Sequence, residues 1–189
     1  MPLVAVTPAV LVVVDVLAWA LFHSATGIAV HLAPRRWFTH DTWLTRARRW
    51  EHDGHTYERL GIRRWKDRLP EAGGLLRGGI SKRRIPSAAD GGLHRLAEET
   101  RRAEWGHDLC AACGPLFLVW NPWWIAAVMV VYGLAVNAPF VAVQRYNRLR
   151  VTRALGRRTN RSTAAPSGDQ PSAAARSRNE RGTTGSSIP

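Results

Sequence analysis

Residues 10–33 read VLVVVDVLAWALFHSATGIAVHLA, an apolar run that predicts a helix. At 1.5 Å of rise per residue, a helix of this length crosses the roughly 30 Å hydrocarbon core of a bilayer with a little tilt. A cleaved signal peptide carries positive charge before its apolar stretch, whereas the first basic residues here, Arg35 and Arg36, follow it. We therefore predict an uncleaved transmembrane anchor over residues 1–33, with its N-terminus outside the cytoplasm.

A second apolar run covers residues 109–143, and it is short for two full spans of about 20 residues each. Asn121 and Pro122 mark a turn inside it, because a residue before proline avoids the helical conformation. A compact or re-entrant helical hairpin is therefore expected, and Asn137 and Pro139 are expected to loosen its cytoplasmic end. The alternative is one long tilted span, which would place one basic block outside.

The charge of the chain is confined to the segments between and after these apolar runs. Its formal net charge is +13, from 27 Lys and Arg against 14 Asp and Glu. Because cytoplasmic loops are enriched in Lys and Arg, both basic blocks are expected in the cytoplasm. The expected organisation is an anchor over 1–33, a basic cytoplasmic and interfacial segment over 34–108, a membrane hairpin over 109–143, a basic juxtamembrane segment over 144–156 and a disordered tail over 157–189. The predicted fold class is thus a small helical integral membrane protein, multi-pass in the cell membrane of a bacterium (the inner membrane).

The segment between the two apolar runs has uneven helical signals. Residues 50–70 are punctuated by glycine and proline, residues 71–90 read as a loop, and residues 93–105 form a helix that runs into the membrane near His107. Four apolar side chains of the segment are expected at the bilayer surface: Trp43, Trp50, Trp65 and Leu69.

Several function classes do not fit the composition. A basic chain with long apolar runs is better explained by anionic lipid headgroups than by nucleic acid. Cys110 and Cys113 lack further ligands and are expected to be small buried helix residues rather than a redox or zinc site. The common nucleotide-binding, zinc-hydrolase and serine-hydrolase motifs do not occur, so no metal and no cofactor is expected.

Polar residues inside the first apolar run share one helical face. Asp15, Trp19 and His23 are spaced i, i+4 and i+8. They indicate either a proton or headgroup contact, or a polar patch that packs against the other helices, and the second interpretation is favoured.

A second polar face lies where the predicted helix enters the membrane. Thr100, Glu104 and His107 are spaced i, i+4 and i+7, so they point the same way. A histidine with a carboxylate one turn away is a workable general base for activating a hydroxyl in acyl or glycosyl transfer at lipid headgroups. The alternative is a helix that ends in interfacial polar residues.

The basic string at 144–150 follows the last apolar run directly. Arg145 and Arg148 supply forked donors and Asn147 an amide, which would suit a headgroup, sugar or phosphate clamp. The alternative is a positively charged membrane anchor.

Four sequence blocks carry a resemblance to a known family. They are Tyr57-x-x-Leu60-Gly61-Ile62-x-x-Trp65-Lys66-Asp67-x-Leu69-Pro70; Arg102-Ala103-Glu104-Trp105-x-His107; Asn121-Pro122-Trp123-Trp124; and Asn137-x-Pro139-Phe140 with Gln144-Arg145-Tyr146-Asn147-Arg148. Over residues 50–150 the chain resembles the glycosyl-4,4'-diaponeurosporenoate acyltransferase family, with Leu149 where that pattern has proline.

The resemblance implies transfer of a fatty acyl chain to the sugar of a glycosylated carotenoid acid or a similar glycolipid, as in the formation of staphyloxanthin-type pigments. His107 would be the base and Glu104 its orienting partner, with the oxyanion stabilised by Lys66, Arg145 or Arg148. The expected partners are the acceptor lipid, a fatty acyl donor and anionic lipid headgroups. The expected substrate contacts are Thr100, Arg102, Tyr57, Trp65, Lys66, Arg145, Asn147 and Arg148. A non-catalytic scaffold or lipid-binding subunit of a carotenoid-modifying complex is the alternative function.

Overall fold

The computed structural model describes residues 7–69 and 91–164, which are helices and connecting turns with no strand among them. The long helices are α1 (Pro8–Leu32), α4 (Gly92–Ala112) and α5 (Trp123–Ala164); the short ones are α2 (His55–Arg59), α3 (Ile62–Trp65) and the 3-10 helices η1 (Arg35–Phe38), η2 (Arg49–Gly54), η3 (Lys66–Arg68) and η5 (Gly114–Val119). The loop predicted at 71–90 and the tail from 165 onward lie outside the described residues.

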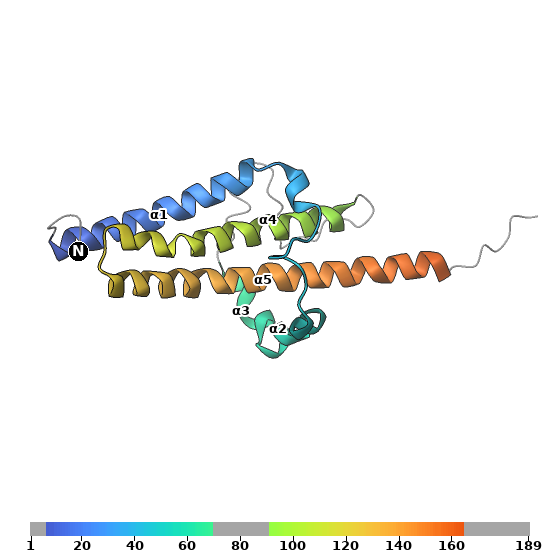
Figure 1. The fold of residues 1–189 in the computed structure, drawn as a ribbon. Coiled ribbons are helices and arrows are strands. Elements are labelled where there is room, and N and C mark those ends of the chain that lie inside the picture. Colours follow the sequence, from blue (N-terminus) through green and yellow to red (C-terminus); the bar gives the residue numbers. More distant parts are fainter. Residues whose placement is uncertain (1–6, 70–90, 165–189) are drawn as a thin grey trace, which may run out of the picture. The chain divides into compact units, whose positions relative to one another are not determined.

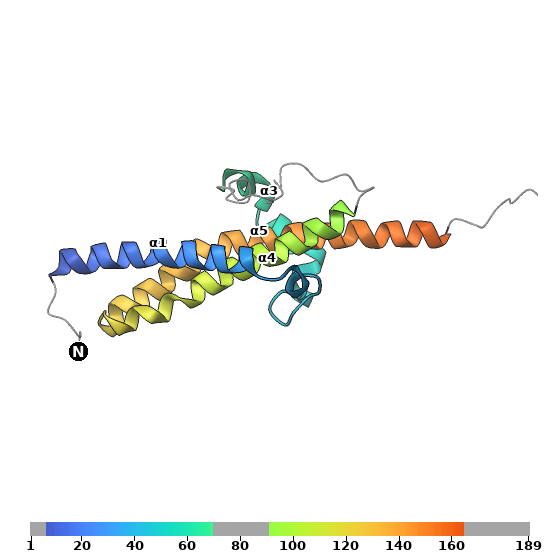
Figure 2. The same cartoon turned by 90° about the horizontal axis from the view of Figure 1, so that it is seen from above.

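The three long helices lie alongside one another because small residues let them approach closely. Figures 1 and 2 show α4 beside α1, with α5 along it. A Cβ atom on Gly133 would lie 2.5 Å from the Trp19 ring, so α5 meets α1 at a residue without a side chain. Gly114, beyond the end of α4, has the backbone of Val130 as its neighbour in the same way. Close contact of this kind is typical of helices packed within a membrane.

The helices α1 and α5 turn most of their apolar side chains outward. Each contains a window long and apolar enough to cross a membrane, and only 11% and 17% of those windows are buried. The core helix of a soluble protein would be mostly buried, and a large exposed apolar surface marks contact with lipid or protein. The predicted class, a small helical membrane protein, is confirmed, and one of its two helices that could span a membrane is N-terminal and the other C-terminal.

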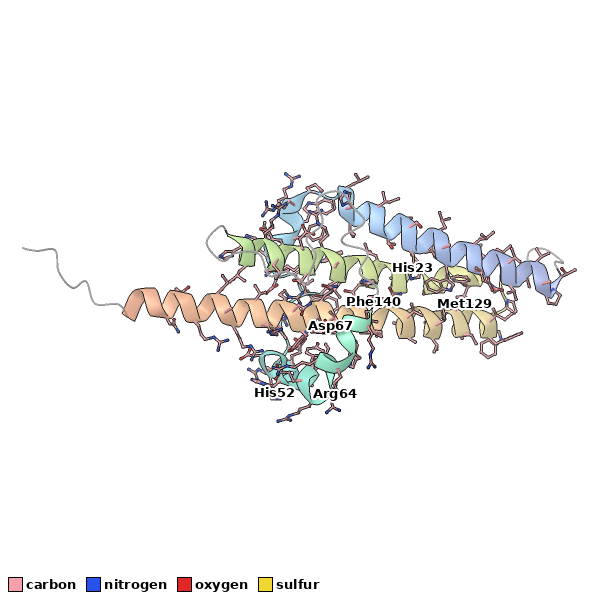
Figure 3. The ribbon with its side chains drawn as sticks, turned by 180° about the vertical axis from the view of Figure 1, so that it is seen from behind. His23, His52, Arg64, Asp67, Met129 and Phe140 are labelled. Atoms are coloured by element: carbon pink, nitrogen blue, oxygen red, sulfur yellow. The ribbon has the colours of Figure 1, made fainter. Side chains whose placement is uncertain are left out.

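The hairpin turns where the sequence predicts. The helix α4 is continuous through His107 to Ala112, η5 extends the first arm, and α5 begins directly after Pro122. Cys110 is buried beside Trp19 and Phe117, whereas Cys113 is only half-buried, and both are free thiols. The buried cluster at this end comprises Trp19, Cys110, Phe117 and Ala126, and Figure 3 labels the neighbouring His23 and Met129.

The helix α5 is longer than the sequence predicts. It continues through Asn137 and Pro139, which were expected to loosen it, and through Leu149, which is buried. Residues 7–155 belong to one compact unit, and residues 156–164 are the described part of a second one. The expected juxtamembrane segment at 144–156 is therefore part of α5, as are the first residues of the expected disordered tail.

The short helices of the basic segment build a second cluster on α5. Tyr57 and Ile62 pack against side chains one to two turns apart on α5, and the cluster comprises Tyr57, Ile62, Val143, Tyr146 and Leu149. Trp65 and Leu69 pack against this cluster rather than facing outward as predicted, because their neighbours on α5 are apolar. Trp43 and Trp50 are exposed, as expected of side chains at a bilayer surface.

Candidate functional site

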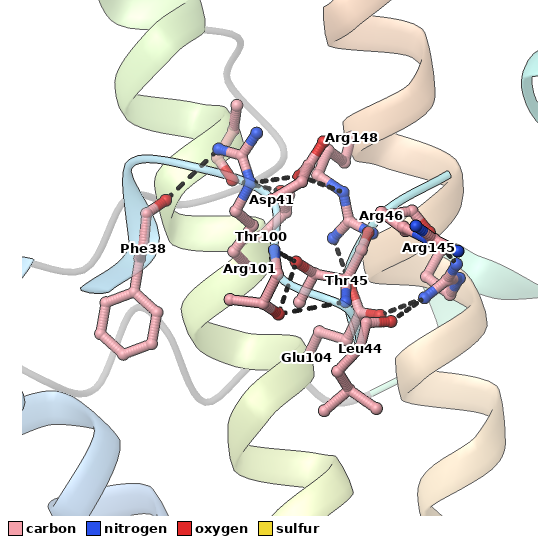
Figure 4. Close-up of polar contacts among 12 residues, drawn as sticks. Phe38, Asp41, Leu44, Thr45, Arg46, Thr100, Arg101, Glu104, Arg145 and Arg148 are labelled. Atoms are coloured by element: carbon pink, nitrogen blue, oxygen red, sulfur yellow. Dashed lines mark hydrogen bonds and ion pairs between the residues drawn. The ribbon is translucent and has the colours of Figure 1, made fainter. Parts of the chain in front are cut away.

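The polar centre of the described chain is the buried guanidinium of Arg145. Its Nε and Nη2 donate to the two carboxylate oxygens of Glu51 at 2.7 and 3.0 Å, and its Nη1 donates to Glu104 at 2.5 Å. The remaining donors reach the backbone carbonyls of Leu44 at 3.0 Å and Arg46 at 2.9 Å. A guanidinium has five N–H donors, so every donor of Arg145 is used within the protein. Figure 4 shows Arg145 of α5 beside Glu104 of α4.

Arg148 completes the same network one turn further along α5. Its Nη1 pairs with the second carboxylate oxygen of Glu104, which is fully buried, and its Nη2 donates to the backbone carbonyl of Thr45. Asp41 lies 3.9 Å from the Nε of Arg148 and pairs with Arg101 at 2.6 Å. The two arginines of α5 therefore bind both α4 and the segment at 41–51.

Glu51 enters this centre because the backbone behind it reverses. His52, Asp53 and Gly54 all have positive φ, and the φ of 98° at Gly54 is one that residues with a side chain rarely adopt. Burial raises the pKa of Glu51, but hydrogen bonds from Arg145, Tyr57 and the backbone of Arg48 outweigh it and hold the pKa below its usual value. Glu51 is therefore a charged acceptor with four donors around it.

Tyr57 shares the Glu51 carboxylate. Its hydroxyl donates to Oε1 at 2.6 Å, and burial together with this bond to a carboxylate raises the pKa of the phenol. Tyr57 was expected to contact substrate, and in the structure it supports the ion network instead.

The histidine of the predicted site has a different partner from the expected one. Nδ1 of His107 lies 3.0 Å from Oδ1 of Asn137, and the ring stacks on Phe140 with centroids 4.7 Å apart. Both carboxylate oxygens of Glu104, the predicted orienting group, face arginines. The spacing on α4 correctly puts Glu104 and His107 toward α5. Glu104 contacts arginines there, whereas His107 contacts Asn137.

Asn137 fixes the orientation of the imidazole. Its Nδ2 donates to the carbonyl of Gly133 at 2.9 Å, so its carbonyl oxygen is the atom directed at His107. A carbonyl oxygen only accepts, and the neutral imidazole must therefore carry its proton on Nδ1. In this tautomer Nε2 holds the lone pair, which a general base requires.

The other predicted contact residues are spread over the unit. Thr100 is buried and donates to the carbonyl of Ala97 at 2.7 Å. Arg102 reaches the carbonyl of His31 on α1, and Lys66 pairs with the adjacent Asp67 at 2.7 Å. Trp65 packs against the cluster on α5, whereas Asn147 is half-buried. The structure therefore groups His107 with Asn137, and Glu104 with Arg145 and Arg148, and does not bring the full predicted set to one point.

Two polar residues of the site were not predicted as site residues. Asn137 carried a signal, since an amide in an apolar helix marks an interhelical hydrogen bond or a functional site. Glu51 carried none beyond its place among basic residues, and its partner Arg145 is 94 positions away. Among residues 7–69 and 91–164, no three His, Cys, Asp or Glu side chains lie together as metal ligands.

Asp15, on the predicted polar face of α1, lies at the other end of the hairpin. Its Oδ1 accepts hydrogen bonds from Nε1 of Trp120 and Nδ2 of Asn121, both at 2.8 Å. Nδ1 of His23 lies 2.9 Å from the carbonyl of Trp19 on its own helix. This arrangement matches the favoured interpretation, a patch that packs against the other helices.

Comparison with known proteins gives one consistent family. The family model for glycosyl-4,4'-diaponeurosporenoate acyltransferase matches residues 34–157. A glycosyl-4,4'-diaponeurosporenoate acyltransferase of Staphylococcus haemolyticus (strain JCSC1435) is 33% identical over 103 residues, which are 54% of this chain and 60% of that protein. One from Staphylococcus aureus (strain bovine RF122 / ET3-1) is 28% identical over 94 residues, 50% of this chain and 56% of that protein. The chain thus spans somewhat more than half the length of these relatives, and no solved structure is significantly similar to it.

Proposed function

Because the chain belongs to the glycosyl-4,4'-diaponeurosporenoate acyltransferase family, we propose that it transfers a fatty acyl chain to a sugar hydroxyl of a membrane glycolipid, with a glycosylated carotenoid acid as the leading candidate. The observation that carries the mechanism is the hydrogen bond between His107 and Asn137. This bond favours the tautomer in which Nε2 of His107 holds the lone pair that a general base requires. The helix α4, which carries His107, continues into the apolar hairpin, where a lipid headgroup would lie.

The proposed reaction is a direct transfer with His107 as general base. Nε2 takes the proton of the sugar hydroxyl while its oxygen forms a bond to the acyl carbonyl carbon. The tetrahedral intermediate then collapses, the bond from that carbon to the donor breaks, and the leaving group receives the proton from His107. No covalent enzyme intermediate is required.

The ion network acts through position rather than contact in this mechanism. Arg145 has no donor left for an oxyanion, so we assign Arg145, Arg148 and Glu104 the task of holding α4 against α5. A misplacement of about 1 Å lowers the rate of an enzyme strongly. Because the network holds α4 against α5, we expect the rate to depend on it through the position of His107 beside Asn137. Lys66 remains the candidate oxyanion donor among the predicted basic residues; it pairs with Asp67 and follows Trp65, which packs against the cluster on α5.

The proposed location is the cell membrane, with the basic segments in the cytoplasm and the N-terminus outside. The support is the charge pattern: arginines follow α1 at 35 and 36, and 145–150 carries three more on α5. The ion network lies at this basic end of the unit. Glu104 of the network is two residues from Arg102 on α4, and Arg102 donates to the carbonyl of His31 in the last turn of α1.

The test is acyl transfer in membranes from a host that makes a glycosylated carotenoid acid. Mass spectrometry of the extracted pigments should show a gain of one acyl chain with the wild-type chain. We expect His107→Ala to lower the initial rate about 100-fold or more, the usual contribution of a general base. His94→Ala removes an exposed histidine of the same helix and should leave the rate unchanged.

Two results would count against the proposal. Full acyl transfer by His107→Ala, at equal protein in the membrane, would remove the histidine from the chemistry. No acylated product with the wild-type chain, in a host that supplies both substrates, would favour the scaffold function.

A further inference from the structure

One carboxylate oxygen of Asp108, the residue after the proposed base, makes no hydrogen bond to the ion network. Asp108 follows His107 on α4 and is one helical turn beyond Glu104, so it shares the face that α4 turns to α5. Its Oδ2 is buried, and no donor within residues 7–69 or 91–164 lies within hydrogen-bonding distance of it. Buried acceptors are almost always paired in folded proteins, so this oxygen needs an explanation.

The neighbouring cations do not supply the missing donor. The charges that act on Asp108 are those of Glu104, Arg145 and Arg148. All five donors of Arg145 are used elsewhere, and Arg148 pairs with Glu104 and the carbonyl of Thr45. Glu104 repels a second carboxylate. The buried Oδ2 of Asp108 is therefore left without a hydrogen-bond donor among the described residues.

We propose that Asp108 binds the sugar of the acceptor, with its Oδ2 accepting a hydrogen bond from one ring hydroxyl. The proposal rests on the function above and deepens it. In the proposed complex, one hydroxyl of the sugar donates a hydrogen bond to Asp108, and another gives its proton to His107. Asp108 thus selects a polyol headgroup and orients it, and it takes no proton itself.

The test separates binding of the sugar from catalysis. A carotenoid quenches tryptophan fluorescence, and the chain has nine tryptophans, so titration of the purified protein in detergent yields Kd directly. The two probes are a glycosylated carotenoid acid and the same carotenoid acid without its sugar. The variants are Asp108→Ala and Asp108→Asn, and the control is Asp53→Asn, an exposed aspartate at positive φ where asparagine is well tolerated.

The expected result is a loss for the glycosylated probe alone. Asp108→Ala should raise its Kd about 10-fold or more, as for a hydrogen bond to a charged group, and change the Kd of the sugar-free probe less than about 2-fold. Asp108→Asn should lose less. The thermal midpoint of Asp108→Ala should stay equal or rise, because an unpaired buried carboxylate does not stabilise the fold.

Other outcomes overturn the proposal. Equal Kd values for wild type and Asp108→Ala with both probes would mean that a water fills the site, and equal losses for both probes would mean a general role in the fold. If the wild type transfers an acyl chain but Asp108→Ala leaves the Kd of the glycosylated probe unaltered, the proposed function stands and the role of Asp108 is wrong. If the sugar is bound selectively through Asp108 but no acyl chain is transferred, the role of Asp108 stands and the proposed function is wrong.

Discussion

The two ends of the described unit bury carboxylates in different ways. Near the hairpin turn, Asp15 is held by two neutral donors, from Trp120 and Asn121. At the opposite end, Glu51 and Glu104 are held by arginines. The first arrangement belongs to a helix surrounded by apolar side chains, and the second joins three separate segments. Neutral hydrogen bonds therefore join α1 to the hairpin turn, whereas ion pairs join α4, α5 and the segment at 41–51 at the opposite end.

The largest effect should follow from removing Arg145. In Arg145→Ala the buried carboxylate of Glu51 loses its arginine and Glu104 keeps only Arg148, and breaking a buried ion pair from one side costs about 3–5 kcal/mol. We expect the thermal midpoint in detergent to collapse and the acyltransferase rate to fall with it. Arg150→Ala removes an exposed arginine of the same helix and is the matched control. A normal midpoint for Arg145→Ala would contradict the view that this end is held by charge.

Removing Asp15 should cost less than removing Arg145. Asp15→Ala leaves Nε1 of Trp120 and Nδ2 of Asn121 without their acceptor, and we expect a loss of about 2–3 kcal/mol in unfolding free energy. Asp15→Asn keeps an acceptor oxygen and should lose less. The measurement is chemical unfolding in detergent. If alanine and asparagine were equally stable, the hydrogen bonds would not be what holds the turn.

A smaller effect is expected where α1 meets α5. Gly133→Ala places a Cβ 2.5 Å from the Trp19 ring, and we expect a net loss of about 1–2 kcal/mol from overpacking, reduced by the better helix propensity of alanine. Gly27→Ala is the control, because no described atom lies within 4 Å of its added Cβ, and it should be neutral or slightly stabilising. Thermal unfolding of both variants checks this. The contact would be looser than described if the two behaved alike.

The smallest effect is the acid sensitivity due to Glu51. Because its folded pKa is below the usual value, its contribution is present above the unfolded pKa and is lost as pH falls through the folded pKa. Between pH 6 and pH 3 the wild type should lose more unfolding free energy than Glu51→Gln, which has no carboxylate to protonate. Unfolding at both pH values measures the difference. Parallel losses in the two proteins would assign the acid sensitivity to other groups.

The sequence predicts the turn end of the molecule well because the physics there is local. Apolar runs and the pair Asn121-Pro122 are sufficient for the spans and the turn. The ion network could not be predicted in this way, because Glu51 and Arg145 meet only after two segments have packed. Spacing on α4 gave the correct face for Glu104 and His107, but the partner of each residue is on α5. The prediction that Pro139 loosens the helix is wrong because it relied on a local signal alone: α5 continues through Pro139.

The contact between Asp15 and the hairpin also orders the assembly of the protein. Asp15 leaves the ribosome 105 positions before Trp120 and 106 before Asn121. During that interval α1 carries an acidic side chain into the bilayer with no partner from the hairpin, which is costly in hydrocarbon. The arrival of the turn removes that cost, so the hairpin stabilises the inserted state of a helix made long before it. Insertion of α1 and its contact with the hairpin turn are therefore thermodynamically linked.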